Sequence, residues 1–164
     1  MAVNLKTLTP SELLVLHADV TDELRDRGVT RSSNNPLGDY AEYLFCKAFE
    51  WRQENNAVKA FDAIDEKTDL KYQIKARRLT PQNPSRQMSA IRNLEMKGFN
   101  ILAAALFDRS YQLLRAALIP HDIVFTKATY REHTNSWRFM LYDTIWLEDG
   151  VVDVTERLRA AVAI

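Results

Sequence analysis

Residues 61–77, with the sequence FDAIDEKTDLKYQIKAR, contain the pattern that decides the fold. From Lys71 to Arg77 polar and apolar side chains alternate strictly, and a period of two predicts a β-strand. The apolar run Val58–Ile64 predicts a second strand, and the polar residues Asp65–Asp69 predict the turn that joins the two strands into a hairpin. The polar face of the second strand consists of Lys71, Gln73, Lys75 and Arg77.

Two helical patterns precede the hairpin. Thr9, Pro10 and Glu12 form a helix-start signal ahead of an apolar stretch, and this first helix is expected to run to about Arg27. A second helix is expected from about Leu37 to Trp51, since its apolar residues gather on one arc of a helical wheel. That arc contains Ala41, Leu44, Phe45, Ala48 and Phe49.

The remainder of the chain alternates between strand and helix patterns. Met88–Met96 suggests a short helix, and the continuous apolar run Ile101–Phe107 predicts a fully buried strand. Further strands are expected at Tyr111–Ile119 and Trp137–Tyr142, and Asp153–Glu156 opens a closing helix. This order predicts an α/β fold with a mixed central β-sheet flanked by helices.

Composition indicates a soluble globular protein of one domain. The 164 residues are 46% hydrophobic and 27% charged, which allows one substantial core. The single cysteine, Cys46, is expected to be a buried small apolar side chain, and its presence alone suits a reducing compartment. Because no apolar segment is long enough for a signal or membrane span, we expect a cytoplasmic protein without membrane contact.

Charge is balanced overall but not locally. Lys and Arg total 22, as do Asp and Glu, so net charge gives no sign of a polyanionic partner. Between Lys67 and Lys97, however, eight basic residues face only two acidic ones, a local excess of six positive charges. This segment predicts a surface that contacts nucleic-acid phosphates, the alternative being a solvated basic face.

Four residues are candidates for one catalytic site. Glu42 falls within the apolar arc of the second helix, where a carboxylate is costly unless it is paired or holds a cation. A hairpin centred between Lys67 and Thr68 places Asp62 opposite Gln73, with Lys75 two residues along on the same face. Oxygen ligands of this kind suit Mg²⁺. The alternatives are a glutamate at the edge of the core and a solvent-facing polar strand.

The segments that carry these candidates resemble the PD-(D/E)xK nucleases. Gly38-Asp-Tyr-Ala-Glu42, Phe61-Asp62-Ala63 and Tyr72-Gln73-Ile74-Lys75 are similar to the helix glutamate, hairpin aspartate and (D/E)xK strand of that family. The similarity covers residues 37–107. Gln73 stands where an acidic residue is commoner, as in the Mrr-like branch, which has Gln-x-Lys.

The resemblance implies a restriction-endonuclease-like core and roles for each residue. Residues 37–119 would form the catalytic core, between an N-terminal helix and loop (1–36) and a C-terminal strand and helix extension (120–164). Asp62, Gln73 and the carbonyl of Ile74 would bind Mg²⁺, or Mn²⁺ in its place, and Glu42 would complete this metal site. Lys75 would orient or activate the attacking water.

The expected function is metal-dependent DNA endonuclease activity in restriction or phage defence. Because the chain is small, we expect a homodimer that offers two sites to two strands. A partner subunit is a candidate source of specificity, which the sequence leaves open. A catalytically inactive DNA-binding module and a non-nuclease interaction domain are the alternatives. Candidate DNA contacts are Arg77, Arg78, Gln82, Asn83, Arg86, Gln87, Asn34 and Asn35.

Overall fold

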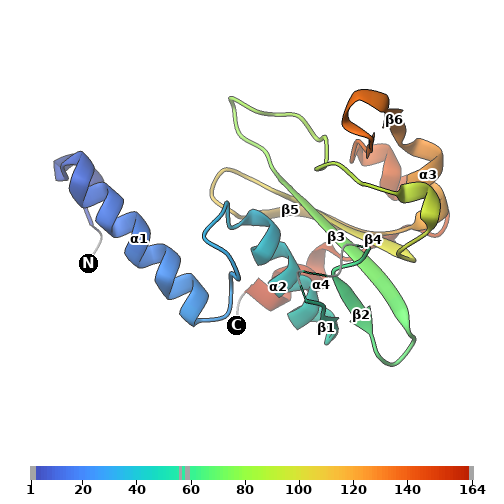
Figure 1. Cartoon of the computed structure of the whole chain (residues 1–164), viewed down its shortest axis with the longest axis horizontal. Helices are drawn as coiled ribbons and strands as arrows, with labels where there is room; N and C mark the ends of the chain where they lie inside the picture. The colour runs from blue at the N-terminus through green and yellow to red at the C-terminus, as the bar shows by residue number, and fades with distance from the viewer. Residues whose placement is uncertain (1–2, 56, 58–59, 163–164) are drawn as a thin grey trace.

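Six strands form one mixed sheet in the computed structural model, which describes residues 3–55, 57 and 60–162 (Figure 1). In sheet order they are β1 (Arg52–Gln53), β2 (Ala63–Asp65), β3 (Leu70–Arg78), β4 (Ile101–Phe107), β5 (Leu113–Pro120) and β8 (Val152–Asp153). β3 and β4 are parallel, and the other neighbouring pairs are antiparallel. The predicted α/β class with a mixed sheet is confirmed.

Helices cover both faces of this sheet (Figure 1). α2 (Leu37–Phe49) and α4 (Thr155–Val162) contact each other and pack on β3 and β5 respectively. α3 (His121–Lys127) contributes Val124 to the core of the opposite face, where the hairpin of β6 (Thr129–Arg131) and β7 (Ser136–Arg138) also packs. The other helices described are α1 (Pro10–Asp26) and the 3-10 turns Leu5–Thr7, Leu94–Met96, Glu132–Thr134 and Asp143–Leu147.

The strand β4 is buried on both faces, as its continuous apolar sequence predicts. Ala103, Ala105 and Phe107 belong to the core beneath α2 and α4. Leu102 and Leu106 face the core on the side of α3. β4 pairs in parallel with β3 along residues Tyr72 to Arg78, so β3 is fixed to the buried centre of the sheet.

β2 and β3 form the predicted hairpin in the predicted register. Ala63 lies opposite Tyr72 and Ile64 lies opposite Lys71. Tyr72 and Ile74 are buried in the core beneath α2, whereas Gln73 and Lys75 on the other side of β3 are half-buried. The two-residue period of the strand thus separates a packing face from a polar face.

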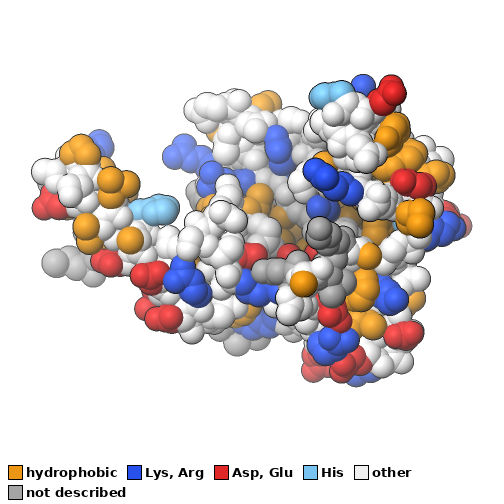
Figure 2. All heavy atoms as spheres, viewed as in Figure 1, with side chains coloured by type: hydrophobic (Ala, Val, Ile, Leu, Met, Phe, Trp, Pro, Cys, Tyr) orange, Lys and Arg blue, Asp and Glu red, His pale blue; other side chains and the backbone are white. Residues whose placement is uncertain are grey.

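α1 projects away from the sheet and buries none of its residues (Figures 1 and 2). Its start is the one predicted, with Thr9 as N-cap and a capping box between Thr9 and Glu12. The apolar side chains along it lie at the surface, and Leu14 is 71% exposed. The helix therefore depends on its caps and local ion pairs rather than on the core.

Three predicted strands are shorter in the structure. β2 begins at Ala63, and residues 58 and 59 of the predicted strand Val58–Ile64 lie outside the described residues. β5 begins at Leu113 because Tyr111, with a φ of +59°, donates its N–H to the carbonyl of Asp108 in a turn. The prediction of a strand at Trp137–Tyr142 is wrong beyond Arg138, where the chain pairs with loop residues instead.

The predicted helix at Met88–Met96 is also wrong, except for the 3-10 turn Leu94–Met96. Met88 donates its backbone N–H to the carbonyl of Phe139, and Ile91 donates to that of Trp137. Both side chains enter the core on the α3 side. Their spacing of three therefore comes from an extended segment with two anchors, not from a helical turn.

No helix within the described residues has the length and apolar character needed to cross a membrane.

Candidate active site

One cleft of about 550 Å³ brings together most of the site residues predicted from the sequence. It lies between the first turn of α2, the β2–β3 hairpin and the loop that follows β3. Eight of the twelve predicted residues line it. They are Asn35, Glu42, Asp62, Gln73, Lys75, Arg77, Arg78 and Asn83.

Asp62 is held against the polar face of β3. Its Oδ2 accepts a hydrogen bond from Gln73 Nε2 at 2.5 Å and another from the backbone N–H of Ile74 at 2.6 Å. Burial raises the pKa of Asp62, and the hydrogen bond from Ile74 and the charge of Lys75 offset part of that rise. Because both of these hydrogen bonds fall on Oδ2, the Oδ1 atom is left for another partner.

Glu42 reaches the same cleft from α2. Its side chain is only 15% exposed, and its Oε2 accepts hydrogen bonds from Gln53 Nε2 at 2.8 Å and from the Arg31 guanidinium. Burial raises the pKa of Glu42, the bond from Gln53 lowers it, and the nearby charge of Asp62 raises it again. Glu42 is directed inward from the apolar arc of α2, as the helical wheel predicts, and its carboxylate is paired.

Lys75 lies in the cleft and is half-buried. Burial lowers the pKa of Lys75, although the negative charges of Asp62 and Glu42 act in the opposite direction. A lysine with a lowered pKa loses its proton more readily near neutral pH. The lowered pKa makes Lys75 a candidate for proton transfer in the cleft.

Two carboxylates of the cleft, Glu42 and Asp62, could hold a metal ion. Mg²⁺ binds through one or two carboxylates and keeps several waters. Glu42 and Asp62 supply two carboxylates whose mutual repulsion a cation would relieve. No group of three His, Cys, Asp or Glu side chains suited to a metal is found in the described part of the chain. Further protein oxygens would come from a reoriented Gln73 amide or from a backbone carbonyl.

The site is held by three residues that were not predicted, Arg31, Asp39 and Gln53. The guanidinium of Arg31 donates to the carboxylate of Glu42, and its Nη1 donates to the carbonyl of Glu54 at 2.8 Å. The carboxylate of Asp39 on α2 accepts from the backbone N–H of Arg31 at 2.8 Å, which fixes the loop on the helix. Arg31 and Gln53 lie outside any periodic pattern, so the sequence gives no signal for them.

Two arginines of β3 extend the cleft beyond the carboxylates. Arg77 donates to the carbonyl of Ser85 at 3.0 Å and to the side chain of Asn83 at 2.8 Å. The guanidinium of Arg78 lies 4.7 Å from the ring centroid of Tyr111. Neither contact neutralises the arginine, so both keep their charge for an anionic ligand.

Four predicted DNA contacts lie outside the lining of this cleft: Asn34, Gln82, Arg86 and Gln87. Arg86 donates to Asp143 at 2.8 Å, so its charge is already paired. Gln87 lines a different cavity. Asn35 does line the cleft, but its side chain also accepts from the backbone N–H of Leu37 at 3.0 Å and caps the start of α2. Composition indicates that these residues can contact DNA, but it does not determine the direction in which a side chain points.

His121 and Cys46, two side chains that could be reactive, are fully or partly shielded from solvent by the surrounding protein. His121 is buried, and its Nε2 lies 2.7 Å from the carbonyl oxygen of Leu94. Burial raises the pKa of the Cys46 thiol to about 12, which keeps it protonated and unreactive at neutral pH.

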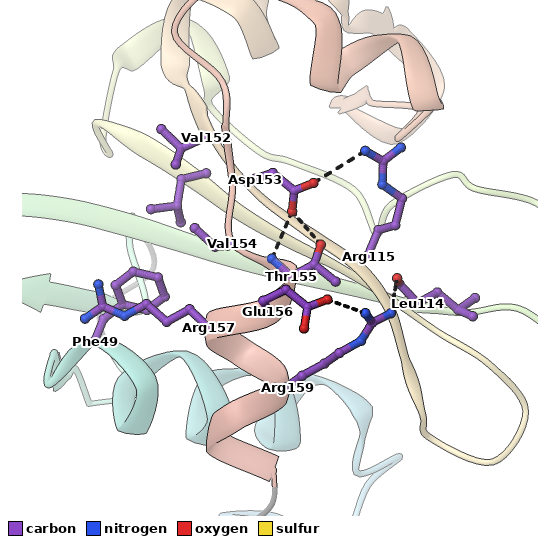
Figure 3. A pocket seen from close by; sticks show the side chains of 11 residues that line it. Phe49, Leu114, Arg115, Val152, Asp153, Val154, Thr155, Glu156, Arg157 and Arg159 are labelled. Carbon is purple, nitrogen blue, oxygen red and sulfur yellow. Dashed lines mark hydrogen bonds and ion pairs between the residues drawn. The ribbon is translucent and has the colours of Figure 1, made fainter.

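A second cavity of about 580 Å³ lies beside β5, β8 and α4 (Figure 3). Its charged groups pair with one another: Arg115 with Asp153 at 3.6 Å, and Arg159 with Glu156 at 2.5 Å. The guanidinium of Arg157 stacks 4.0 Å from the ring centroid of Phe49. None of the predicted site residues lines this cavity, and its internal pairing leaves little for a ligand.

Comparison with known proteins assigns no family to the chain: no family model matches it, and no curated protein matches it.

Proposed function

We propose that the chain is a metal-dependent DNA endonuclease of the PD-(D/E)xK type, acting in restriction or phage defence. The observation that carries this proposal is that Glu42, Asp62, Gln73 and Lys75 line one cleft. They come from one helix and one hairpin, in the chain order of the Gln-x-Lys nucleases. The mixed sheet with a parallel β3–β4 pair supports a restriction-endonuclease-like core.

The side chains divide the work of phosphodiester hydrolysis. Asp62, Glu42, Gln73 and the carbonyl of Ile74 would hold the ion. When bound, Mg²⁺, or Mn²⁺ in its place, polarises a phosphoryl oxygen and lowers the pKa of a coordinated water. Lys75 orients the attacking water and accepts its proton, a role favoured by its lowered pKa.

The basic residues of the cleft would position the DNA strand. Arg77 and Arg78 bind phosphate oxygens, and Asn83 and Asn35 contribute neutral donors beside them. One chain offers one such cleft, so cleavage of both strands calls for a homodimer. Specificity for a target would then come from the dimer geometry or from a partner subunit.

A catalytically inactive DNA-binding module is the second candidate. One observation favours it: Gln73 is neutral, and among the described residues that line the cleft only Glu42 and Asp62 are carboxylates. A neutral amide is a weaker ligand than a carboxylate. In this case the basic cleft would bind DNA without cutting it.

Incubation with supercoiled plasmid separates these candidates. In Mg²⁺ or Mn²⁺ we expect conversion to nicked and linear DNA, and none in EDTA. DNA binding without cleavage in either ion would favour the inactive module. Absence of both cleavage and salt-dependent DNA binding would favour an interaction domain unrelated to nucleic acid.

Changing Gln73 to glutamate tests the weak point of the metal site directly. Gln73→Glu is expected to strengthen Mg²⁺ binding roughly tenfold, about 1.4 kcal/mol, since it adds a third carboxylate beside Asp62. Without metal the two adjacent carboxylates repel, so the melting temperature in EDTA should fall. Calorimetric titration with Mg²⁺ and thermal unfolding measure the two effects.

The matched control for this change is Gln112→Glu, which adds the same charge at an exposed position after β4. It should leave Mg²⁺ affinity unchanged. Equal Mg²⁺ affinity in wild type and Gln73→Glu would show that residue 73 does not face the ion.

A further inference from the structure

A third cavity, of about 390 Å³, lies between the segment before Leu94 and the β6–β7 hairpin. Three arginines line it, Arg92 from the segment and Arg131 and Arg138 from the hairpin, together with His133. None of the described residues that line it is acidic. The cavity therefore concentrates positive charge in a protein whose net charge is zero.

The arginines of this cavity differ in their partners from several other arginines of the protein. Arg86, Arg115 and Arg159 each form ion pairs with carboxylates. Within the described residues, none of the three arginines of the cavity forms an ion pair. The nearby carboxylate of Glu95 instead accepts from Trp137 Nε1 at 2.8 Å. Their charge is thus available to an anionic ligand from outside the chain.

One short stretch of chain separates this cavity from the candidate active site. Ser89 lines the active-site cleft, whereas its neighbours Met88 and Ala90 line the third cavity. The stretch is anchored at both ends, because Met88 donates to the carbonyl of Phe139 at 3.0 Å and Ile91 donates to that of Trp137 at 3.1 Å. The two cavities therefore border the same short stretch of chain, which two backbone hydrogen bonds anchor.

We propose that the third cavity binds the phosphate backbone of the DNA strand that runs out of the active-site cleft over Ser89. The strand would pass from Arg77 and Arg78 to the arginines of the cavity. Guanidinium groups without carboxylate partners bind phosphates with two parallel hydrogen bonds. This inference rests on the proposed function, and it adds Arg131 and Arg138, which lie outside the basic segment Lys67–Lys97, to the phosphate contacts of Arg92.

The test compares two double variants that remove the same charge. Arg131→Gln/Arg138→Gln alters the cavity, and Arg25→Gln/Arg27→Gln alters the exposed end of α1. Fluorescence anisotropy with a labelled DNA duplex in EDTA, over a range of salt concentrations, gives Kd and its salt dependence. The cavity variant should weaken binding about tenfold or more and lower the salt slope by roughly 2, near one unit for each phosphate contact. The α1 variant should change Kd less than about twofold.

A single variant on the other wall of the cavity provides an independent check. Arg92→Gln should weaken binding and lower the salt slope by about 1, since it removes one phosphate contact. Equal effects of the two double variants, or wild-type binding by the cavity variants, would overturn the inference.

Failure of this inference is distinguishable from failure of the nuclease proposal. A protein that cuts plasmid but binds DNA independently of Arg131 and Arg138 would contradict only the inference. If the wild type never cuts DNA but the cavity variants lose DNA binding, only the nuclease proposal would be contradicted. Absence of DNA binding by the wild type would contradict both.

Discussion

Lys75→Met reduces plasmid cleavage in Mg²⁺ by about 10²–10⁴-fold, the usual loss when a general acid or base is removed. We expect this loss because burial lowers the pKa of Lys75 from its usual value toward neutrality. Methionine has a similar apolar stem, so the protein should remain folded and should still bind DNA. Cleavage rates and anisotropy with the same DNA measure the two properties.

The pH dependence of cleavage follows from the same shift. A lysine that accepts a proton must first be neutral, so the rate should rise with pH through the lowered pKa of Lys75. The Lys75→Arg variant keeps a positive charge, but its guanidinium cannot lose a proton, so this variant should be inactive at every pH. Lys47→Met, on the exposed side of α2, is the matched control and should cut normally. Normal cleavage by Lys75→Met would remove Lys75 from the mechanism.

Asp62→Asn should abolish detectable cleavage while it stabilises the metal-free protein. The catalytic loss is expected to be roughly 10³-fold or more, since the change removes a metal ligand worth several kcal/mol. Asparagine still has an oxygen that can accept the hydrogen bond from the backbone N–H of Ile74. Plasmid cleavage and Mg²⁺ titration measure the loss.

The stability effect of Asp62→Asn has a defined sign. Burial holds the folded-state pKa of Asp62 above its unfolded value, so the folded state binds that proton more tightly. The stability linked to this proton is present at low pH and is lost as pH rises through the folded pKa. The gain from asparagine in EDTA should therefore be absent in acid and should grow toward neutral pH.

The control for this substitution lies in the same hairpin. Asp69 adopts a left-handed φ of +59°, a conformation that asparagine tolerates, and it lies outside the cleft. Asp69→Asn should leave cleavage, Mg²⁺ affinity and the pH dependence of stability near those of the wild type. If Asp62→Asn binds Mg²⁺ like the wild type, Asp62 is not a ligand.

The parts of the fold that periodicity governs could be predicted from the sequence. The alternation from Lys71 to Arg77 gave β3 and, with the turn at Asp65–Asp69, the register that sets Asp62 beside Gln73. The apolar arc of α2 gave the inward position of Glu42. In each case neighbouring residues of one element determine the direction of the side chain, so local sequence contains the answer.

Features that depend on distant partners could not be predicted. Arg86, a candidate DNA contact, forms an ion pair with Asp143, 57 residues away, and no local pattern in the sequence indicates that partner. The guanidinium of Arg31 donates to Glu42, and the loop that contains Arg31 is fixed on α2 by the hydrogen bond to Asp39. β1 and β8, of two residues each, exist because a neighbouring strand offers them hydrogen bonds.

β3 carries the chemistry of the cleft and the packing of the core on the two sides of one strand. A substitution can change one side alone, whereas deletion of one residue before Tyr72 would turn Gln73 and Lys75 into the core and expose Ile74. Small in-frame deletions there would consequently give unfolded protein rather than folded, inactive protein. Descendants of this sequence would keep the length of the hairpin even after losing catalysis, so constant hairpin length among them would report selection on folding, not on cleavage.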